Sequence, residues 1–134
     1  MPAFKKDHLS DIPTLRFQGS HLPWKPIRHH FGITAFGINV LTAEKPGDPV
    51  VEEHTEVDAS GTQHEEIYFV FAGSATFTVD GETVDAPTGT FVCVPDPAVT
   101  RSAVANEAGT MVLAVGGEPE GVFRISEWEN KYFD

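Results

Sequence analysis

HEEIYFVFAGSATFTVDGETVD, residues 64 to 85, is the stretch of this sequence that decides its fold. Aromatic and β-branched residues dominate Glu66 to Ala72, which predicts a strand that ends at Gly73. Ser74 to Val79 alternates between apolar and polar residues and predicts a second strand. Asp80-Gly81 then supplies a two-residue turn, because both positions tolerate positive φ, and Glu82 to Asp85 runs back. The stretch therefore predicts an antiparallel meander.

The side chains of the first of these strands divide between two faces. A period of two places His64, Glu66, Tyr68 and Val70 on one face, and Glu65, Ile67, Phe69 and Phe71 on the other. The second face is almost wholly apolar, whereas the first begins with two groups that can bind a metal or a proton. A buried carboxylate needs a partner, so Glu66 is either paired inside the protein or solvated at the end of the strand. The pattern leaves both interpretations open.

Length and charge exclude several classes of protein. A chain of 134 residues corresponds to one domain that can bury a core without disulfides. There are 9 Lys plus Arg against 20 Asp plus Glu, which gives a net charge of −11. Nucleic acids and anionic membranes require a basic surface, so neither is an expected partner.

The single cysteine and the hydropathy pattern indicate an intracellular protein. Cys93 lies in the apolar run Phe91-Val92-Cys93-Val94 and is predicted to be a small buried hydrophobic residue. No apolar run approaches the roughly 20 residues of a membrane span. The first residues lack the apolar stretch of a signal peptide. We therefore expect a cytoplasmic location.

Short strands are predicted on both sides of the central meander. Residues 1–22 show no sustained period and are interpreted as an arm, and His29 and His30 are predicted to lie on an extended segment as surface or hydrogen-bonded side chains. The remaining predicted strands cover residues 32–43, 50–57, 90–94, 98–105 and 110–115. Ser126 and Glu129 form a capping-box pattern that predicts a short C-terminal helix. Many short strands with little helix indicate an all-β protein, a small barrel or sandwich.

Two partial motifs resemble the signatures of the cupin family. Glu66, followed by six residues and Gly73, is similar to the end of the first signature. Gly89, followed by Thr90 to Val94 and then Pro95, resembles the glycine, five residues and proline of the second. This resemblance implies an all-β fold, a cupin-like antiparallel β-barrel (jelly roll) with a short C-terminal helix. It assigns residues 1–23 to an N-terminal arm and residues 24–134 to the barrel domain.

The same resemblance implies a metal site, which in cupins combines two histidines and a glutamate of the first motif with one histidine of the second. The glutamate carries over onto Glu66, whereas the two upstream histidine positions fall among residues 59–62 and the last falls on Thr100, none of which is a histidine. Three of the four expected ligands are therefore absent in simple register. A replacement set would suit a divalent metal such as Zn, Fe, Mn or Ni, and comprises His54, Glu56, Glu66 and, as a reserve ligand, His64. The other interpretation is a polar pocket whose metal site has been lost.

We expect a ligand pocket inside the barrel, and we expect Arg101 to point outward. The predicted lining comprises Glu66, Tyr68, His54, Glu56 and Thr100. With three usual ligands absent, the first expectation is a protein that binds an unidentified small molecule and holds metal weakly or not at all. Two alternatives stay open: a metal-dependent isomerase, epimerase, decarboxylase or dioxygenase with Glu66 as ligand or acid/base, and an accessory or structural partner protein. The resemblance and the unpatterned arm also predict a homodimer.

Overall fold

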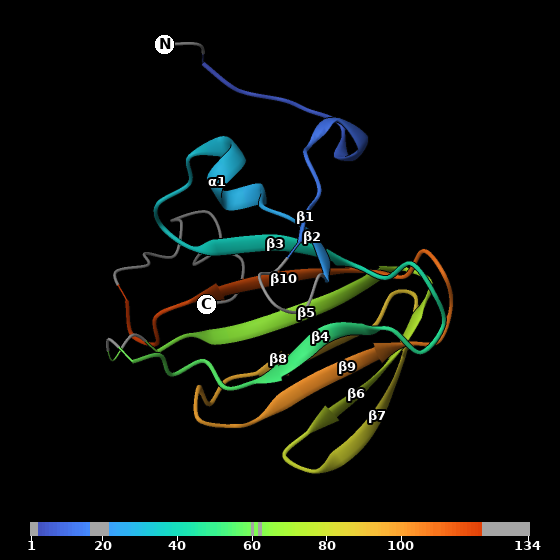
Figure 1. Ribbon diagram of the computed structural model, residues 1–134. Helices are drawn as coiled ribbons and strands as arrows, with labels where there is room; N and C mark the ends of the chain where they lie inside the picture. Colours follow the sequence, from blue (N-terminus) through green and yellow to red (C-terminus); the bar gives the residue numbers. More distant parts are fainter. Residues whose placement is uncertain (1–2, 17–21, 60, 62, 122–134) are drawn as a thin grey trace, which may run out of the picture.

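Two antiparallel sheets packed face to face form the protein (Figure 1). The computed structural model describes residues 3–16, 22–59, 61 and 63–121. The larger sheet contains, in spatial order, β1 (Leu15–Arg16), β2 (Pro23–Lys25), β3 (Gly37–Thr42), β10 (Met111–Gly117), β5 (Glu65–Ala72) and β8 (Phe91–Val94). The smaller contains β4 (Pro49–His54), β9 (Arg101–Ala105), β6 (Ser74–Val79) and β7 (Glu82–Pro87).

The prediction of an all-β antiparallel jelly roll is confirmed, with one refinement. The two sheets remain open at their edges, so the chain forms a sandwich and does not close into a barrel. The predicted C-terminal helix lies outside the described residues. Within the described part of the chain, no helix has both the length and the apolar character needed to cross a membrane.

The core lies between the sheets and follows the alternation of the strands. On β5, Tyr68 and Val70 are buried, and on β6 Ala75 and Phe77 are buried, as the period of two requires. Apolar side chains from facing strands complete this core, among them Val112, Ala103, Ala105 and Val94. Burial of this apolar surface stabilises the sandwich and fixes which face of β5 points inward. Glu66 has the same parity as Tyr68 and is therefore on the inner face.

The central hairpin has the predicted turn. Val79 pairs with Glu82, and Asp80 and Gly81 between them have φ of 50° and 79°. Both central residues are thus in the left-handed region, as a tight hairpin turn requires.

Replacing Gly81 by Val is expected to lower the free energy of unfolding by about 1–2 kcal/mol, because a β-branched side chain resists positive φ. A Cβ at this position would meet no atom within 4 Å, so the cost is conformational and not steric. Gly81→Asn is the control, since Asn tolerates this conformation, and it should keep most of the stability in urea unfolding. Equal losses for Val and Asn would contradict the assignment of the turn.

The segment before β3 differs from the prediction. His29 and His30 lie on a short helix, α1 (Ile27–Phe31), and not on an extended segment, and the strand expected from residue 32 begins at Gly37. Gly32, with φ of 72°, ends the helix, and its N–H bonds back to His29 O. His30 Nε2 lies 2.6 Å from Asp7 Oδ2.

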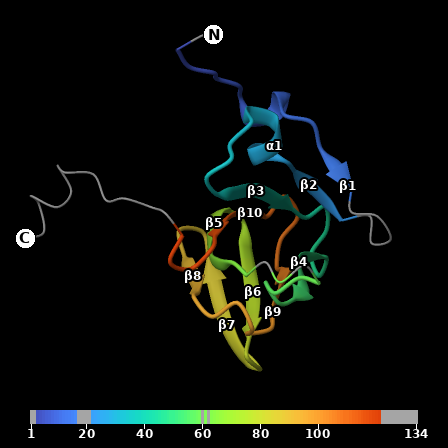
Figure 2. The same ribbon diagram turned by 90° about the vertical axis from the view of Figure 1, so that its left-hand side faces the viewer.

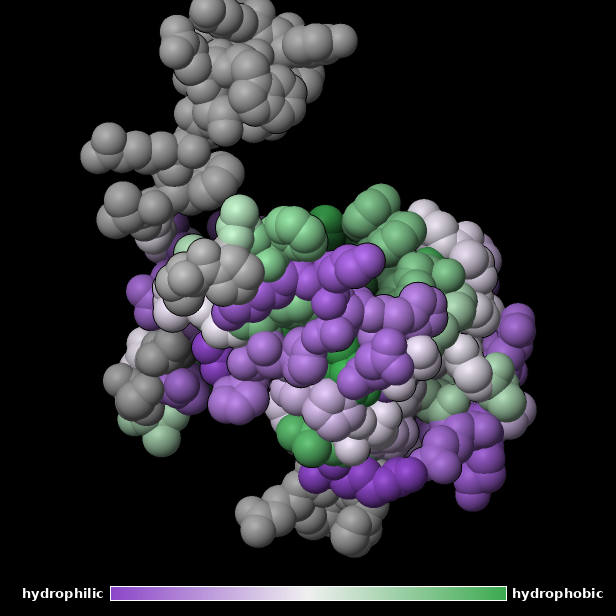
Figure 3. Space-filling model, turned by 90° about the horizontal axis from the view of Figure 1, so that it is seen from above, coloured by the Kyte–Doolittle hydropathy of each residue, from purple (hydrophilic) through white to green (hydrophobic). Residues whose placement is uncertain are grey.

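The N-terminal segment, α1 and β2 lie on the outer side of β3, away from the smaller sheet (Figure 2). This segment includes a short 3-10 helix (Leu9–Asp11), and Ile12 after it is buried while its carbonyl accepts a bond from Lys25 Nζ at 2.8 Å. Seen from this side, hydrophilic side chains cross the middle of the surface between hydrophobic ones (Figure 3). The described part of the predicted arm is thus attached to the sheet at Ile12 and through the pairing of β1 with β2, whereas residues 3–8 are exposed.

The prediction that Cys93 is buried is wrong. Cys93 is exposed, because it shares its parity on β8 with Phe91, which is 64% exposed and points away from the core. Phe91 stacks on Phe69 of β5 with ring centroids 4.2 Å apart. A continuous apolar run does not reveal which of its residues face inward, and the register with β5 decides this.

Candidate functional site

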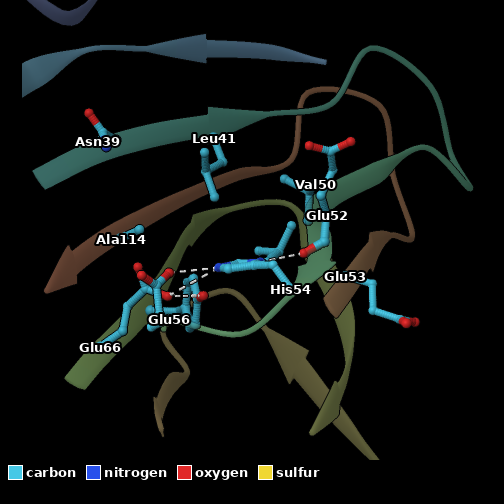
Figure 4. Close-up of a pocket in the computed structure, with 11 residues that line it drawn as sticks. Asn39, Leu41, Val50, Glu52, Glu53, His54, Glu56, Glu66 and Ala114 are labelled. Atoms are coloured by element: carbon cyan, nitrogen blue, oxygen red, sulfur yellow. Dashed lines mark hydrogen bonds and ion pairs between the residues drawn. The ribbon is translucent and has the colours of Figure 1, made fainter. Parts of the chain in front are cut away.

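A cavity of about 390 Å³ lies between the two sheets (Figure 4). One part of its wall is apolar and the other carries carboxylates. The lining residues come from β3, β10, β4, β5 and the loop after β4, and are Asn39, Leu41, Val50, Val51, Glu52, Glu53, His54, Glu56, Glu66, Tyr68 and Ala114. This volume is within the range of small-molecule sites.

His54 and Glu56 form an ion pair at the polar end of the cavity. His54 Nε2 lies 2.7 Å from Glu56 Oε1, and its Nδ1 lies 2.6 Å from the carbonyl oxygen of Glu52. A carbonyl oxygen can only accept, so Nδ1 must carry a proton. Nε2 faces a carboxylate, and the ring satisfies both partners when it is an imidazolium. The hydrogen bond that His54 Nε2 donates to Glu56 accordingly raises the pKa of His54.

Glu66 is the centre of a second group of contacts. The Tyr68 hydroxyl donates a short hydrogen bond to Glu66 Oε1, and Arg101 Nη1 donates to the same oxygen at 3.3 Å. His54 Nε2 lies 3.9 Å from this atom. The Arg101 side chain is fully buried, and its other bonds reach Val99 O from Nε (3.0 Å) and Asp96 O from Nη2 (3.2 Å). The guanidinium therefore joins the loop before β9 to the carboxylate of β5.

Their surroundings shift the pKa values of Glu56 and Glu66 in opposite directions. Burial raises the pKa of Glu66, and the charge of Glu56 adds to this effect against the opposing hydrogen bond from Tyr68. Burial also acts to raise the pKa of Glu56, but the hydrogen bond and charge of His54, together with Glu66 and the charge of Arg101, outweigh burial, so the pKa of Glu56 is lowered. Burial raises the pKa of the Tyr68 hydroxyl. Glu56 is thus the carboxylate that stays ionised, and Glu66 is the one that takes up a proton more readily.

The structure brings together four of the five residues that were predicted to line the pocket: His54, Glu56, Glu66 and Tyr68. Thr100 is not among the lining residues and is exposed in the loop before β9. The reserve ligand His64 lies beside the cluster, with Nδ1 3.6 Å from Glu56 Oε2. The four residues meet because β4 and β5 belong to facing sheets.

The prediction that Arg101 points outward is wrong. The resemblance to the second cupin motif placed Thr100 inward, and a shift of one residue moves every side chain of a strand to the other face. The observed inner face of β9 is Arg101, Ala103 and Ala105, whereas Val104 is 42% exposed. The alternation of the buried alanines at 103 and 105 with the more exposed Val104 gives the parity of this strand, and Arg101 shares the parity of the alanines.

A divalent metal fits this arrangement poorly, although three ligand groups converge. One ligand atom from each of His54, Glu56 and Glu66 can be chosen such that all three lie within 4.8 Å of one another. Three protein ligands would match the number in catalytic zinc sites. However, Glu66 Oε1 already accepts from Tyr68 and Arg101, and the guanidinium brings a permanent positive charge next to this oxygen. Donors within the protein thus already bond to the oxygen that Glu66 would offer to an ion.

Comparison with solved structures identifies the fold of this chain. No family model matches the sequence, and no curated protein is similar to it. Among solved structures, a cupin protein from Bacteroides fragilis shares 18% identity, with a TM-score of 0.68 over 94% of this chain and 93% of that chain. A sugar phosphate isomerase from a cupin superfamily, from Silicibacter pomeroyi, shares 17% identity, with a TM-score of 0.67 over 86% and 76%.

A third solved structure, a putative sugar phosphate isomerase from Acidithiobacillus ferrooxidans, shares 26% identity, with a TM-score of 0.59. That alignment covers 75% of this chain and 61% of the other. Likeness at these identities concerns the arrangement of strands and not the activity. Together with the two open antiparallel sheets, it shows that this chain has the single-domain cupin fold.

Proposed function

We propose that this protein binds a small uncharged or cationic organic molecule in the cavity between its sheets. One observation carries the proposal: the wall joins an apolar part, formed by Leu41, Val50, Val51 and Ala114, to an end with several carboxylates. An apolar body with one polar or cationic group complements both parts of such a wall. Metal binding that is weak or absent belongs to the same proposal, because Glu66 Oε1 already accepts hydrogen bonds from Tyr68 and Arg101.

The charge of the cavity argues against a phosphorylated ligand. Two of the similar structures are named sugar phosphate isomerases, so a sugar phosphate is the first class to weigh. Within the described lining there is no lysine or arginine, and His54 is its one cationic side chain, against Glu52, Glu53, Glu56 and Glu66. Arg101 is fully buried and already bonded to protein oxygens. Because His54 and Arg101 balance Glu56 and Glu66, the excess charge of the lining is that of Glu52 and Glu53, and a phosphate dianion would meet a site of its own sign.

A series of ring compounds that differ in one group tests this proposal. We expect benzylamine and benzyl alcohol to bind, with benzylamine roughly tenfold tighter, and phenyl phosphate not to bind, in calorimetry and ligand-observed NMR. Glu56→Gln should remove most of the preference for the amine over the alcohol. Glu53→Gln is the matched control, because Glu53 is exposed at the rim and should change the preference little.

Two results would contradict the proposal. Tighter binding of phenyl phosphate than of benzylamine would mean that the assigned ligand class is wrong. No binding of any probe at about 10 mM, a concentration at which even weak sites fill, would mean that the cavity does not serve as a small-molecule site.

A metal-dependent enzyme of the cupin type is the second candidate function. Its support is the convergence of His54, Glu56 and Glu66, which are the residues that would hold the ion. Elemental analysis of protein purified without chelators separates the two candidates. Stoichiometric metal that disappears in Glu66→Gln would favour the enzyme.

A further inference from the structure

We propose that Arg101 is the resident cation of the cluster of His54, Glu56 and Glu66, and that the residue at position 101 decides whether this cluster holds a metal ion. The proposal rests on the proposed function only in that both concern the same cavity. In this proposal the guanidinium neutralises the negative charge of Glu66, as a bound divalent ion would otherwise do. Nothing in it depends on which organic ligand is bound.

The register of the smaller sheet places Arg101 at the cluster. Arg101 of β9 is the direct Cα partner of His54 of β4, and on its other side it pairs with Val79 of β6. It belongs to the inner face of β9, with Ala103 and Ala105. Directly paired residues of neighbouring strands have side chains about 5 Å apart at Cβ, so position 101 and His54 project toward the same end of the cavity.

The bonds of the guanidinium fill the space next to Glu66. All three of its nitrogens donate to oxygens: one reaches Glu66 Oε1 and two reach the backbone carbonyls of Asp96 and Val99. A guanidinium has no acceptor atom and cannot ligate a metal. An incoming ion would therefore have to share Glu66 with a fixed positive charge that the backbone holds in place.

The charges of the cluster balance without a metal. Glu56 and Glu66 supply two negative charges when ionised, and Arg101 and the imidazolium of His54 supply two positive ones. A divalent ion bound to neutral His54 and the two carboxylates would also give a neutral cluster, but Arg101 would then add one uncompensated positive charge beside Glu66, whose side chain is 14% exposed. The ion and the guanidinium would repel each other across this shared carboxylate. The Arg101 guanidinium therefore disfavours binding of a divalent metal ion at this cluster.

The test replaces the charge and then adds a ligand. Arg101→Met removes the charge and keeps an unbranched side chain of moderate length, whereas Arg101→His also places an imidazole beside His54. Zn²⁺ affinity is measured by calorimetry with a competing chelator, and Co²⁺ binding is followed by visible absorption, which reports the geometry of the bound ion. We expect Arg101→His to bind Zn²⁺ at least ~100-fold tighter than the wild type, with Arg101→Met in between.

Several outcomes would overturn the proposal. Equal Zn²⁺ affinity in the wild type and in a folded Arg101→His variant would mean that Arg101 does not control the site. If the variants do not fold by circular dichroism, the wild type decides: stoichiometric metal after growth in Zn²⁺-supplemented medium, or a rise in melting temperature with added Zn²⁺, would disprove the proposal. A metal-free wild type with an unchanged melting temperature would support it. Benzylamine binding is measured separately. A failure of the small-molecule proposal therefore does not decide whether Arg101 controls metal binding, and the reverse also holds.

Discussion

Replacing Arg101 by Met is expected to lower the free energy of unfolding by about 3 kcal/mol or more, which is a large share of the stability of a domain this size. The side chain of Glu66 is only 14% exposed, so loss of Arg101 leaves a mostly buried carboxylate with one strong donor fewer. The carbonyls of Asp96 and Val99 lose their side-chain partners at the same time. Urea unfolding followed by tryptophan fluorescence measures the change.

Two further variants separate this mechanism from a simple loss of volume. Arg101→Met with Glu66→Gln should recover a substantial part of the lost stability, because the amide does not carry the buried charge. Arg16→Met applies the same substitution to an exposed ion pair, Arg16–Glu44 at 2.7 Å, and should change stability little, since water replaces the partner there. Equal losses for Arg16→Met and Arg101→Met would refute the role of burial.

Gly73→Ala is expected to cost about 3 kcal/mol or more of unfolding free energy, for a different reason. Gly73 has φ of 71°, and an added Cβ would lie 2.8 Å from Cα of Thr110 and still closer to its Oγ1. Thr110 is fully buried and its hydroxyl is bonded to the backbone of neighbouring residues, so it cannot move away. Backbone strain and a steric clash therefore add together.

The matched control is Gly89→Ala. Gly89 also has positive φ, 95°, but a Cβ there would meet nothing within 4 Å, so only the conformational cost of about 1–2 kcal/mol remains. The difference between the two variants in chemical unfolding isolates the close approach of Gly73 to Thr110. A Gly73→Ala protein as stable as Gly89→Ala would show that the contact is not tight in solution.

Local sequence features predicted most of the fold because they depend on short-range geometry. Alternation along residues 66–72 placed Glu66 and Tyr68 on one face, and the turn at Asp80-Gly81 followed from two residues that tolerate positive φ. The prediction failed where alternation was weak or absent. His29 and His30 lie on a helix that local polarity did not reveal, and Cys93 faces outward from an apolar run whose parity only strand pairing defines.

The sequence by itself determined the antiparallel strands, the central hairpin and the shared face of Glu66 and Tyr68, because a period of two and turn residues are properties of neighbouring positions. That this face points inward was implied by the resemblance to cupins and not by the period. Only the tertiary structure decided that β4 and β5 face each other across a cavity, and that Arg101 and not Thr100 points inward and contacts Glu66. The register of β9 against β4 and β6 depends on contacts between residues far apart in the chain. A shift of one residue in that register would turn Thr100 inward and Arg101 outward. The site would then lose the positive charge of the guanidinium.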